Sequence, residues 1–136
     1  MLGHDDNAYK LPRGRKDWGE PLAATAARET FEETGYHTSL LLLTRTSQPA
    51  LALSDPSHPY HAEAKAAQCT AEDGTLAVVP WYVGVGDSTA KPVAGTQMED
   101  ENYEAVWVAY DEAPSLMADS VYDLELRRLV QTANGI

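Results

Sequence analysis

The chain has 136 residues, of which 43% are hydrophobic and 23% charged, a composition that suits one soluble domain with a single modest core. A net charge of −11 disfavours binding to nucleic acid duplexes and to anionic membranes. No apolar run approaches the roughly 20 residues of a membrane span, and the single cysteine, Cys69, excludes an internal disulfide. We therefore expect one domain over residues 1–136, in the cytoplasm or, as the alternative, the nucleus.

The N-terminal segment is poor in residues that favour strands. Residues 1–6 predict an irregular polar lead, and residues 9–12 predict one short strand. A basic cluster follows directly, formed by Lys10, Arg13, Arg15 and Lys16. It fits either a solvated charged loop or a set of phosphate contacts, because the arginine fork matches phosphate geometry.

Residues 21–34 predict a helix, with Pro21 at its first position, an alanine-rich middle and Gly35 as a left-handed stop. One face is formed by Ala23, Ala24, Ala27 and Phe31 and should pack on a sheet. Glu29, Glu32 and Glu33 lie on the opposite face, within an arc of roughly 100°. They occupy the last turns, where like charges and the helix dipole both disfavour carboxylates. The cluster is either a solvated acidic face or a site for a hard divalent cation.

The spacing around this helix is specific. It reads Gly, five residues, Glu, seven residues, then Arg-Glu-Thr-Phe-Glu-Glu-Thr-Gly-Tyr over residues 14–36. It resembles the Nudix box of the Nudix hydrolase superfamily, whose fixed positions are matched by Gly14, Glu20, Arg28, Glu29, Glu32, Glu33 and Gly35. The sequence departs from the family at Thr30 and Tyr36, where aliphatic residues are usual. The resemblance implies an α/β (α+β) fold, an α/β/α sandwich with a mixed central sheet, a loop–helix–loop box and a C-terminal helix.

The resemblance also implies residue roles. Glu29, Glu32 and Glu33 would hold Mg²⁺ or Mn²⁺, with the backbone carbonyl of Gly14 facing the metal. Gly14, Glu20, Arg28 and Gly35 would have structural roles in the box, Glu20 and Arg28 as a charge pair. Arg13, Arg15 and Lys16 would bind substrate phosphates. Only thirteen residues precede Gly14, so we expect the N-terminal strands of the family to be missing here and a homodimer to be one way to cover the short N-terminus.

After the box, residues 39–44 predict a buried strand. Residues 47–66 carry three prolines and predict a flexible loop over the substrate. His58 and His61 with Cys69 form an incomplete zinc pattern, and the pattern favours a zinc site less than it favours the substrate loop. Strands are predicted around Cys69 and over residues 75–85, joined by a turn at 72–74, with Pro80 at an edge or bulge. Trp81 and Tyr82 are predicted in the core rather than stacked on a nucleobase.

Residues 86–97 predict a polar loop, and an acidic stretch follows it. In the family an acid before a strand resembling residues 104–108 serves as base or further ligand. The candidates are Glu99, Asp100, Glu101 and Glu104, each also explained by a solvated turn, and Glu101 is the one we select as catalytic. A final helix is predicted over residues 120–133, with an apolar stripe.

The predicted function is a metal-dependent pyrophosphohydrolase that cleaves the diphosphate of a nucleoside diphosphate linked to X, a small-molecule substrate. Residues 11–15 are similar to the Leu-Pro-Lys-Gly of members that cleave diadenosine or diphosphoinositol polyphosphates. Two alternatives differ in class: a non-catalytic binding or regulatory module with the same fold, and a truncated domain that folds only with a partner.

Overall fold

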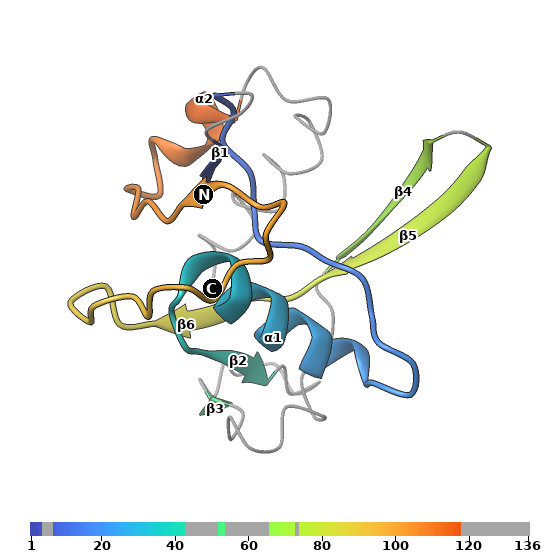
Figure 1. Cartoon of the computed structure of the whole chain (residues 1–136), viewed down its shortest axis with the longest axis horizontal. Coiled ribbons are helices and arrows are strands. Elements are labelled where there is room, and N and C mark those ends of the chain that lie inside the picture. Colours follow the sequence, from blue (N-terminus) through green and yellow to red (C-terminus); the bar gives the residue numbers. More distant parts are fainter. Residues whose placement is uncertain (4–6, 43–51, 54–65, 73, 118–136) are drawn as a thin grey trace.

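The computed structural model describes residues 1–3, 7–42, 52–53, 66–72 and 74–117 (Figure 1). In chain order the elements are β1 (Leu2–Gly3), α1 (Leu22–Thr34), β2 (Thr38–Leu42), β3 (Ala52–Leu53), β4 (Ala66–Glu72), β5 (Thr75–Trp81), β6 (Gly84–Gly86), β7 (Tyr103–Glu104) and α2 (Ala113–Leu116). The combination of helices and strands confirms the predicted α/β class. Every strand pair in the described ranges is antiparallel, so the mixed sheet and the sandwich stay predictions.

The core lies where α1 packs on the three-stranded sheet β3-β2-β6. Ala23 of α1 and Leu40 of β2 are both buried, and Ala26 and Tyr82 pack against them. Small alanine side chains let the helix backbone lie close to the sheet. The buried strand expected at 39–44 is thus confirmed over residues 39–42, the part that the structure describes, and so is the core position of Tyr82. Phe31, which was predicted on the same face, stacks on the ring of His37 with centroids 4.2 Å apart.

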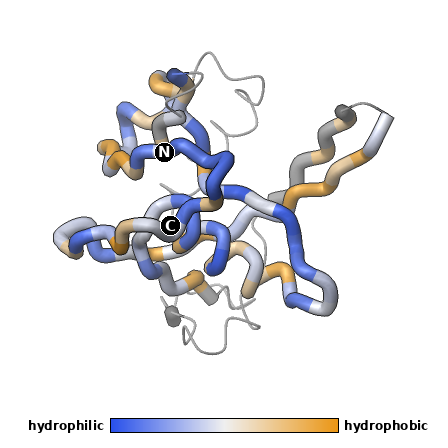
Figure 2. The backbone as a smooth tube through the Cα atoms, in the orientation of Figure 1, coloured by the Kyte–Doolittle hydropathy of each residue, from blue (hydrophilic) through white to orange (hydrophobic). Residues whose placement is uncertain are grey.

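Strands β4 and β5 form a hairpin that extends away from the rest of the molecule (Figure 1). Gly74 closes its turn with φ 76°. The apolar residues of β5 remain visible along this extension in Figure 2, and Leu76 and Val78 are exposed. The predicted pair of strands is confirmed. The second strand is shorter than expected, because the run 75–85 divides into β5 and β6. Within the described residues β5 pairs with β4 alone, so its other edge is open and Pro80 is tolerated there.

Three local predictions are wrong. The lead expected to be irregular contains β1, which pairs with β7 across about a hundred positions, a contact that local propensity does not show. Part of the loop expected at 47–66 is β3, paired with β2. The strand expected within 104–108 lies instead at Tyr103–Glu104, because it follows the pairing with β1.

The remaining predictions of this kind concern residues that the structure does not describe. They are the incomplete zinc pattern, whose His58 and His61 lie outside the described residues, and the helix expected at 120–133. None of the helices in the described ranges combines the length and apolar character that a membrane span requires.

Candidate active site

Helix α1 keeps the electrostatic imbalance that its sequence indicates. Its first turn has no acidic residue and its last turn no basic one. Gly35 ends it in the left-handed region, with φ 73°, and a Cβ there would overlap the backbone of Val93. Pro21 is the cap residue, one position before the expected place, with φ −66° and ψ 144°. The carboxylates near the C-terminal end therefore depend on other elements for compensation.

Two of the three carboxylates on the acidic face of α1 are buried rather than solvated. Glu29 and Glu33 are only 9% and 4% exposed. Glu33 Oε2 accepts a hydrogen bond of 2.9 Å from the backbone N–H of Arg13. Burial raises the pKa of Glu33 to about 7, and the charges of Glu101 and Glu29 add to this effect. Burial also raises the pKa of Glu29, although the Arg28 guanidinium opposes the shift.

Arg28 forms ion pairs with three glutamates, Glu20, Glu29 and Glu32. Its Nε lies 2.9 Å from Glu20 Oε1, and its Nη2 donates to Glu20 Oε2 (3.0 Å) and to the carbonyl of Arg15 (2.9 Å). Its Nη1 lies 2.9 Å from Glu29 Oε1 and 2.8 Å from Glu32 Oε2. The hydrogen bonds from Arg28 lower the pKa of Glu20 to about 2. The predicted Glu20–Arg28 pair is therefore present, and it fastens the box loop to the helix.

The three helix carboxylates are arranged differently from the expected trio. Glu29 and Glu32 meet at one nitrogen of Arg28, whereas Glu33 is bound to the backbone of Arg13. In the part of the chain that the structure describes, no three acidic, histidine or cysteine side chains converge as a metal site requires. The expectation of three convergent carboxylates is thus wrong for this structure. The physical reason is that Arg28 and the Arg13 amide bind the carboxylates from two directions.

Gly14 lies against the carboxylate of Glu29. A Cβ built on Gly14 would overlap the carboxyl carbon and both oxygens of Glu29. The loop can approach the helix this closely only without a side chain at position 14. The role predicted for Gly14 in the box thus has a steric reason in the structure.

The Gly14→Ala variant is expected to lose about 1–3 kcal/mol of unfolding free energy, because the new methyl group must displace Glu29. Urea unfolding measures this loss. Gly19→Ala is the control in the same loop, since a Cβ at Gly19 meets no atom within 4 Å and only its φ of 79° is strained. A loss in Gly14→Ala no greater than that in Gly19→Ala would contradict the steric role.

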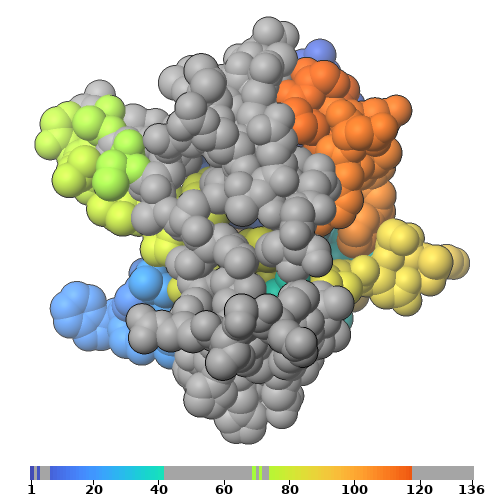
Figure 3. Space-filling view, turned by 180° about the vertical axis from the view of Figure 1, so that it is seen from behind, coloured from blue at the N-terminus to red at the C-terminus, as the bar shows by residue number. Residues whose placement is uncertain are grey.

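The basic loop is exposed, as a substrate-binding surface needs to be. Arg13, Arg15 and Lys16 are all exposed, and the loop that carries them protrudes in the space-filling view of Figure 3 (blue). Lys16 Nζ donates to the carbonyl of Asp17 at 3.0 Å. The phosphate contacts of these three residues stay predictions.

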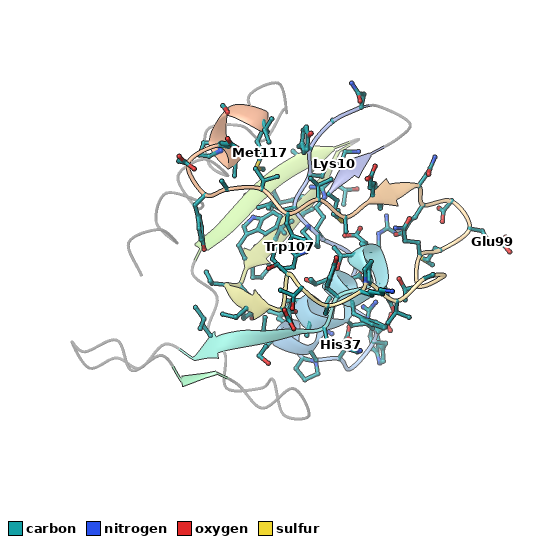
Figure 4. All side chains as sticks on the ribbon, turned by 90° about the vertical axis from the view of Figure 1, so that its left-hand side faces the viewer. Lys10, His37, Glu99, Trp107 and Met117 are labelled. Atoms are coloured by element: carbon teal, nitrogen blue, oxygen red, sulfur yellow. The ribbon has the colours of Figure 1, made fainter. Side chains whose placement is uncertain are left out.

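The acidic stretch after residue 97 places one candidate close to the helix. Glu101 is half-buried, and its charge acts on both Glu29 and Glu33. Glu99 points outward from its loop (Figure 4), and Asp100 and Glu104 are exposed. Among the acidic candidates of this stretch, Glu101 is therefore the one whose charge raises the pKa values of Glu29 and Glu33.

Two contacts at the end of α1 were missed by sequence reasoning. Thr96 Oγ1 donates to the carbonyl of Glu32 at 2.7 Å, and Gln97 Nε2 donates to the carbonyl of Glu33 at 2.9 Å. Each of these residues lies 64 positions after the glutamate whose carbonyl it binds, and these carbonyls have no partner within the helix. The sequence of this segment predicts only a polar loop.

Comparison with known protein families shows to which family the chain belongs. The NUDIX domain family matches residues 3–129, almost the whole chain. The chain belongs to the NUDIX family. This match confirms the resemblance seen in the box and extends it far beyond residues 14–36.

A curated relative supports the same assignment over a short stretch. It is the protein named "Nucleoside diphosphate-linked moiety X motif 6" from Xenopus laevis, which is 58% identical over 31 residues. That stretch covers 23% of this NUDIX chain and 14% of the frog protein. No solved structure matches the chain.

Proposed function

We propose that this NUDIX protein is a hydrolase that cleaves pyrophosphate bonds with the help of a divalent metal ion, Mg²⁺ or Mn²⁺. The observation that carries the proposal is the pair of buried carboxylates, Glu29 and Glu33, on a helix end that disfavours negative charge. Membership in the NUDIX family supports the hydrolase class. A structural helix would gain stability by replacing these groups, so their burial indicates a chemical use.

The donor chemistry fits such a metal ion, although the present arrangement of the side chains in the described residues does not bring three carboxylates together. Mg²⁺ and Mn²⁺ prefer oxygen ligands, and Glu29, Glu32 and Glu33 supply carboxylates on one helix. The raised pKa values of Glu29 and Glu33 show that Arg28 and the Arg13 amide do not fully offset their burial. The Gly14 carbonyl is a further candidate ligand, since Gly14 adjoins Glu29. When bound, the metal would offset diphosphate charge and lower the pKa of a water molecule.

The residues of the chain have separate tasks in this proposal. Arg13, Arg15 and Lys16 bind phosphate oxygens from the exposed loop, where the arginine fork provides paired donors. Arg28 and Glu20 hold that loop at a fixed distance from the helix. A carboxylate, either Glu29 or Glu101, accepts the proton of the attacking water. The two products each keep one part of the cleaved diphosphate.

The proposed substrate is a nucleoside diphosphate linked to a further group X, as the name of the frog relative states for that protein. The basic loop at residues 10–16 favours multiply phosphorylated compounds within this class, such as diadenosine or diphosphoinositol polyphosphates. A NUDIX-fold binding module without turnover is the alternative in another class.

The Glu32→Gln variant is expected to lose at least about a hundredfold in kcat/KM while it remains folded. The amide can still accept the Arg28 hydrogen bond, so the effect reports on charge rather than on folding. The measurement is Mg²⁺-dependent product release from ADP-ribose, diadenosine tetraphosphate, nucleoside triphosphates and a diphosphoinositol. Glu112→Gln, an exposed position beside α2, is the matched control. Equal hydrolysis by wild type and Glu32→Gln would overturn these roles, and binding without turnover would favour the alternative.

A further inference from the structure

Gln97 connects the C-terminal end of α1 to β7. Its Nε2 donates to the carbonyls of Glu33 (2.9 Å) and Tyr103 (2.8 Å), and its Oε1 accepts from the Tyr103 N–H at 2.9 Å. The side-chain amide thus bonds to both backbone groups of Tyr103, as a neighbouring strand would. Its orientation is fixed, because the two carbonyls need donors and the N–H needs an acceptor.

The segment closed by this link carries Glu101. Residues 97 and 103 are joined by the Gln97 side chain, and between them Glu101 N donates to the carbonyl of Met98 at 3.1 Å. The Met98 N–H in turn donates to Glu101 Oε2 at 3.0 Å. Glu101 therefore sits in a compact turn that runs from Gln97 to Tyr103 and is closed by the two hydrogen bonds between these residues. The same glutamine binds the carbonyl of Glu33, whose carboxylate senses the Glu101 charge.

The negative charge of Glu101 can stay near those of Glu29 and Glu33 only if other contacts hold its turn in place. Glu101 repels Glu29 and Glu33, and a free loop would move it into solvent. The three hydrogen bonds of the Gln97 side chain, one to the Glu33 carbonyl and two to the backbone of Tyr103, can hold the turn against this repulsion. Thr96 also binds the helix end, at the Glu32 carbonyl, but its bond does not reach β7.

We propose that Gln97 is a positioning residue that fixes Glu101 beside Glu29 and Glu33. The inference rests on the proposed function for the use of these carboxylates, but the placement itself is a property of the fold. Gln97 does not touch the reacting atoms in this proposal. It acts by setting how far the acidic turn stands from the helix.

The placement is tested without turnover by hydrogen–deuterium exchange on the metal-free protein. In Gln97→Ala, the Tyr103 amide should exchange at least about tenfold faster than in wild type, because it loses its acceptor. Thr96→Val is the matched control: it removes a hydrogen bond from the same helix end but should leave Tyr103 exchange unchanged. Unchanged exchange in Gln97→Ala would show that the β1 pairing alone holds β7, and would overturn the proposal.

The consequence for the site is tested by Mn²⁺ titration and by kinetics. Gln97→Ala should weaken Mn²⁺ binding about tenfold and lower kcat more than it changes KM, as removal of outer supports of metal sites does. In a Glu101→Gln background the same substitution should add little, since both changes act through one group. Additive effects, or wild-type Mn²⁺ affinity in Gln97→Ala, would overturn the positioning role. If the wild type hydrolyses none of the substrates, the proposed function fails separately, and the Mn²⁺ titration still decides the role of Gln97.

Discussion

Replacing Glu33 by glutamine is expected to stabilise the protein at pH 8 by about 3 kcal/mol and to lower its hydrolase activity by at least about a hundredfold. Glu33 is buried, and its pKa is raised from 4.5 to about 7. The folded protein therefore keeps a proton on Glu33 between these pH values, where the unfolded chain has lost it. Wild-type stability should fall as pH rises from about 4.5 to about 7, at 1.36 kcal/mol per unit of pKa difference.

Urea unfolding in EDTA between pH 4.5 and pH 8 measures this contribution. The glutamine keeps an oxygen that can accept from the Arg13 N–H, so the comparison isolates the charge. The two proteins should be equally stable near pH 4.5 and diverge above it. Glu99→Gln is the control, since the same substitution at an exposed side chain removes no buried charge. A stability difference that does not change with pH would show that Glu33 titrates normally.

The box helix is the part of the fold and site that sequence predicts best. Its signals are local: a proline before the first turn, alanines inside, and a glycine that adopts φ 73° at the end. The spacing of Glu20 and Arg28 likewise identifies a pair that the structure contains. Such features depend on residues close in sequence, so periodicity and spacing are sufficient to find them.

What sequence does not reveal depends on contacts between distant segments. The burial of Glu29 and Glu33 accompanies the closure of two segments on the helix, the loop at Gly14 on Glu29 and the segment at Thr96 and Gln97 on the helix end. Neither closure leaves a periodic pattern. The same holds for β1, whose two residues become a strand only because β7 lies beside them.

The arrangement of the carboxylates was missed for a related reason. Helical spacing places Glu29, Glu32 and Glu33 on one face, but it does not show where each charge finds compensation. Arg28 binds two of them and the Arg13 amide binds the third. Side-chain length and backbone donors thus decide which oxygens meet.

Replacing Arg28 by alanine is expected to cost about 3 kcal/mol of unfolding free energy at pH 7, because it leaves several carboxylates with reduced compensation. The Arg28 side chain is 27% exposed, and its guanidinium contacts Glu20, Glu29 and Glu32 as well as the Arg15 carbonyl. In a domain of this size the loss corresponds to roughly 10 °C in Tm. Arg28→Lys should recover only part of it, since an ammonium cannot reproduce the fork that spans Glu20 and the loop carbonyl.

The pH dependence separates this mechanism from a general loss of packing. Arg28 lowers the pKa of Glu20 from 4.5 to about 2, so its stabilisation of Glu20 is complete above pH 4.5 and is lost as pH falls through about 2. The stability difference between wild type and Arg28→Ala should therefore shrink across that acid range in thermal or urea unfolding. Arg15→Ala, which removes an exposed arginine but keeps the carbonyl that Arg28 binds, should stay within about 0.5 kcal/mol of wild type. A difference that persists undiminished at pH 2 would assign the effect to the lost methylene packing of Arg28 instead.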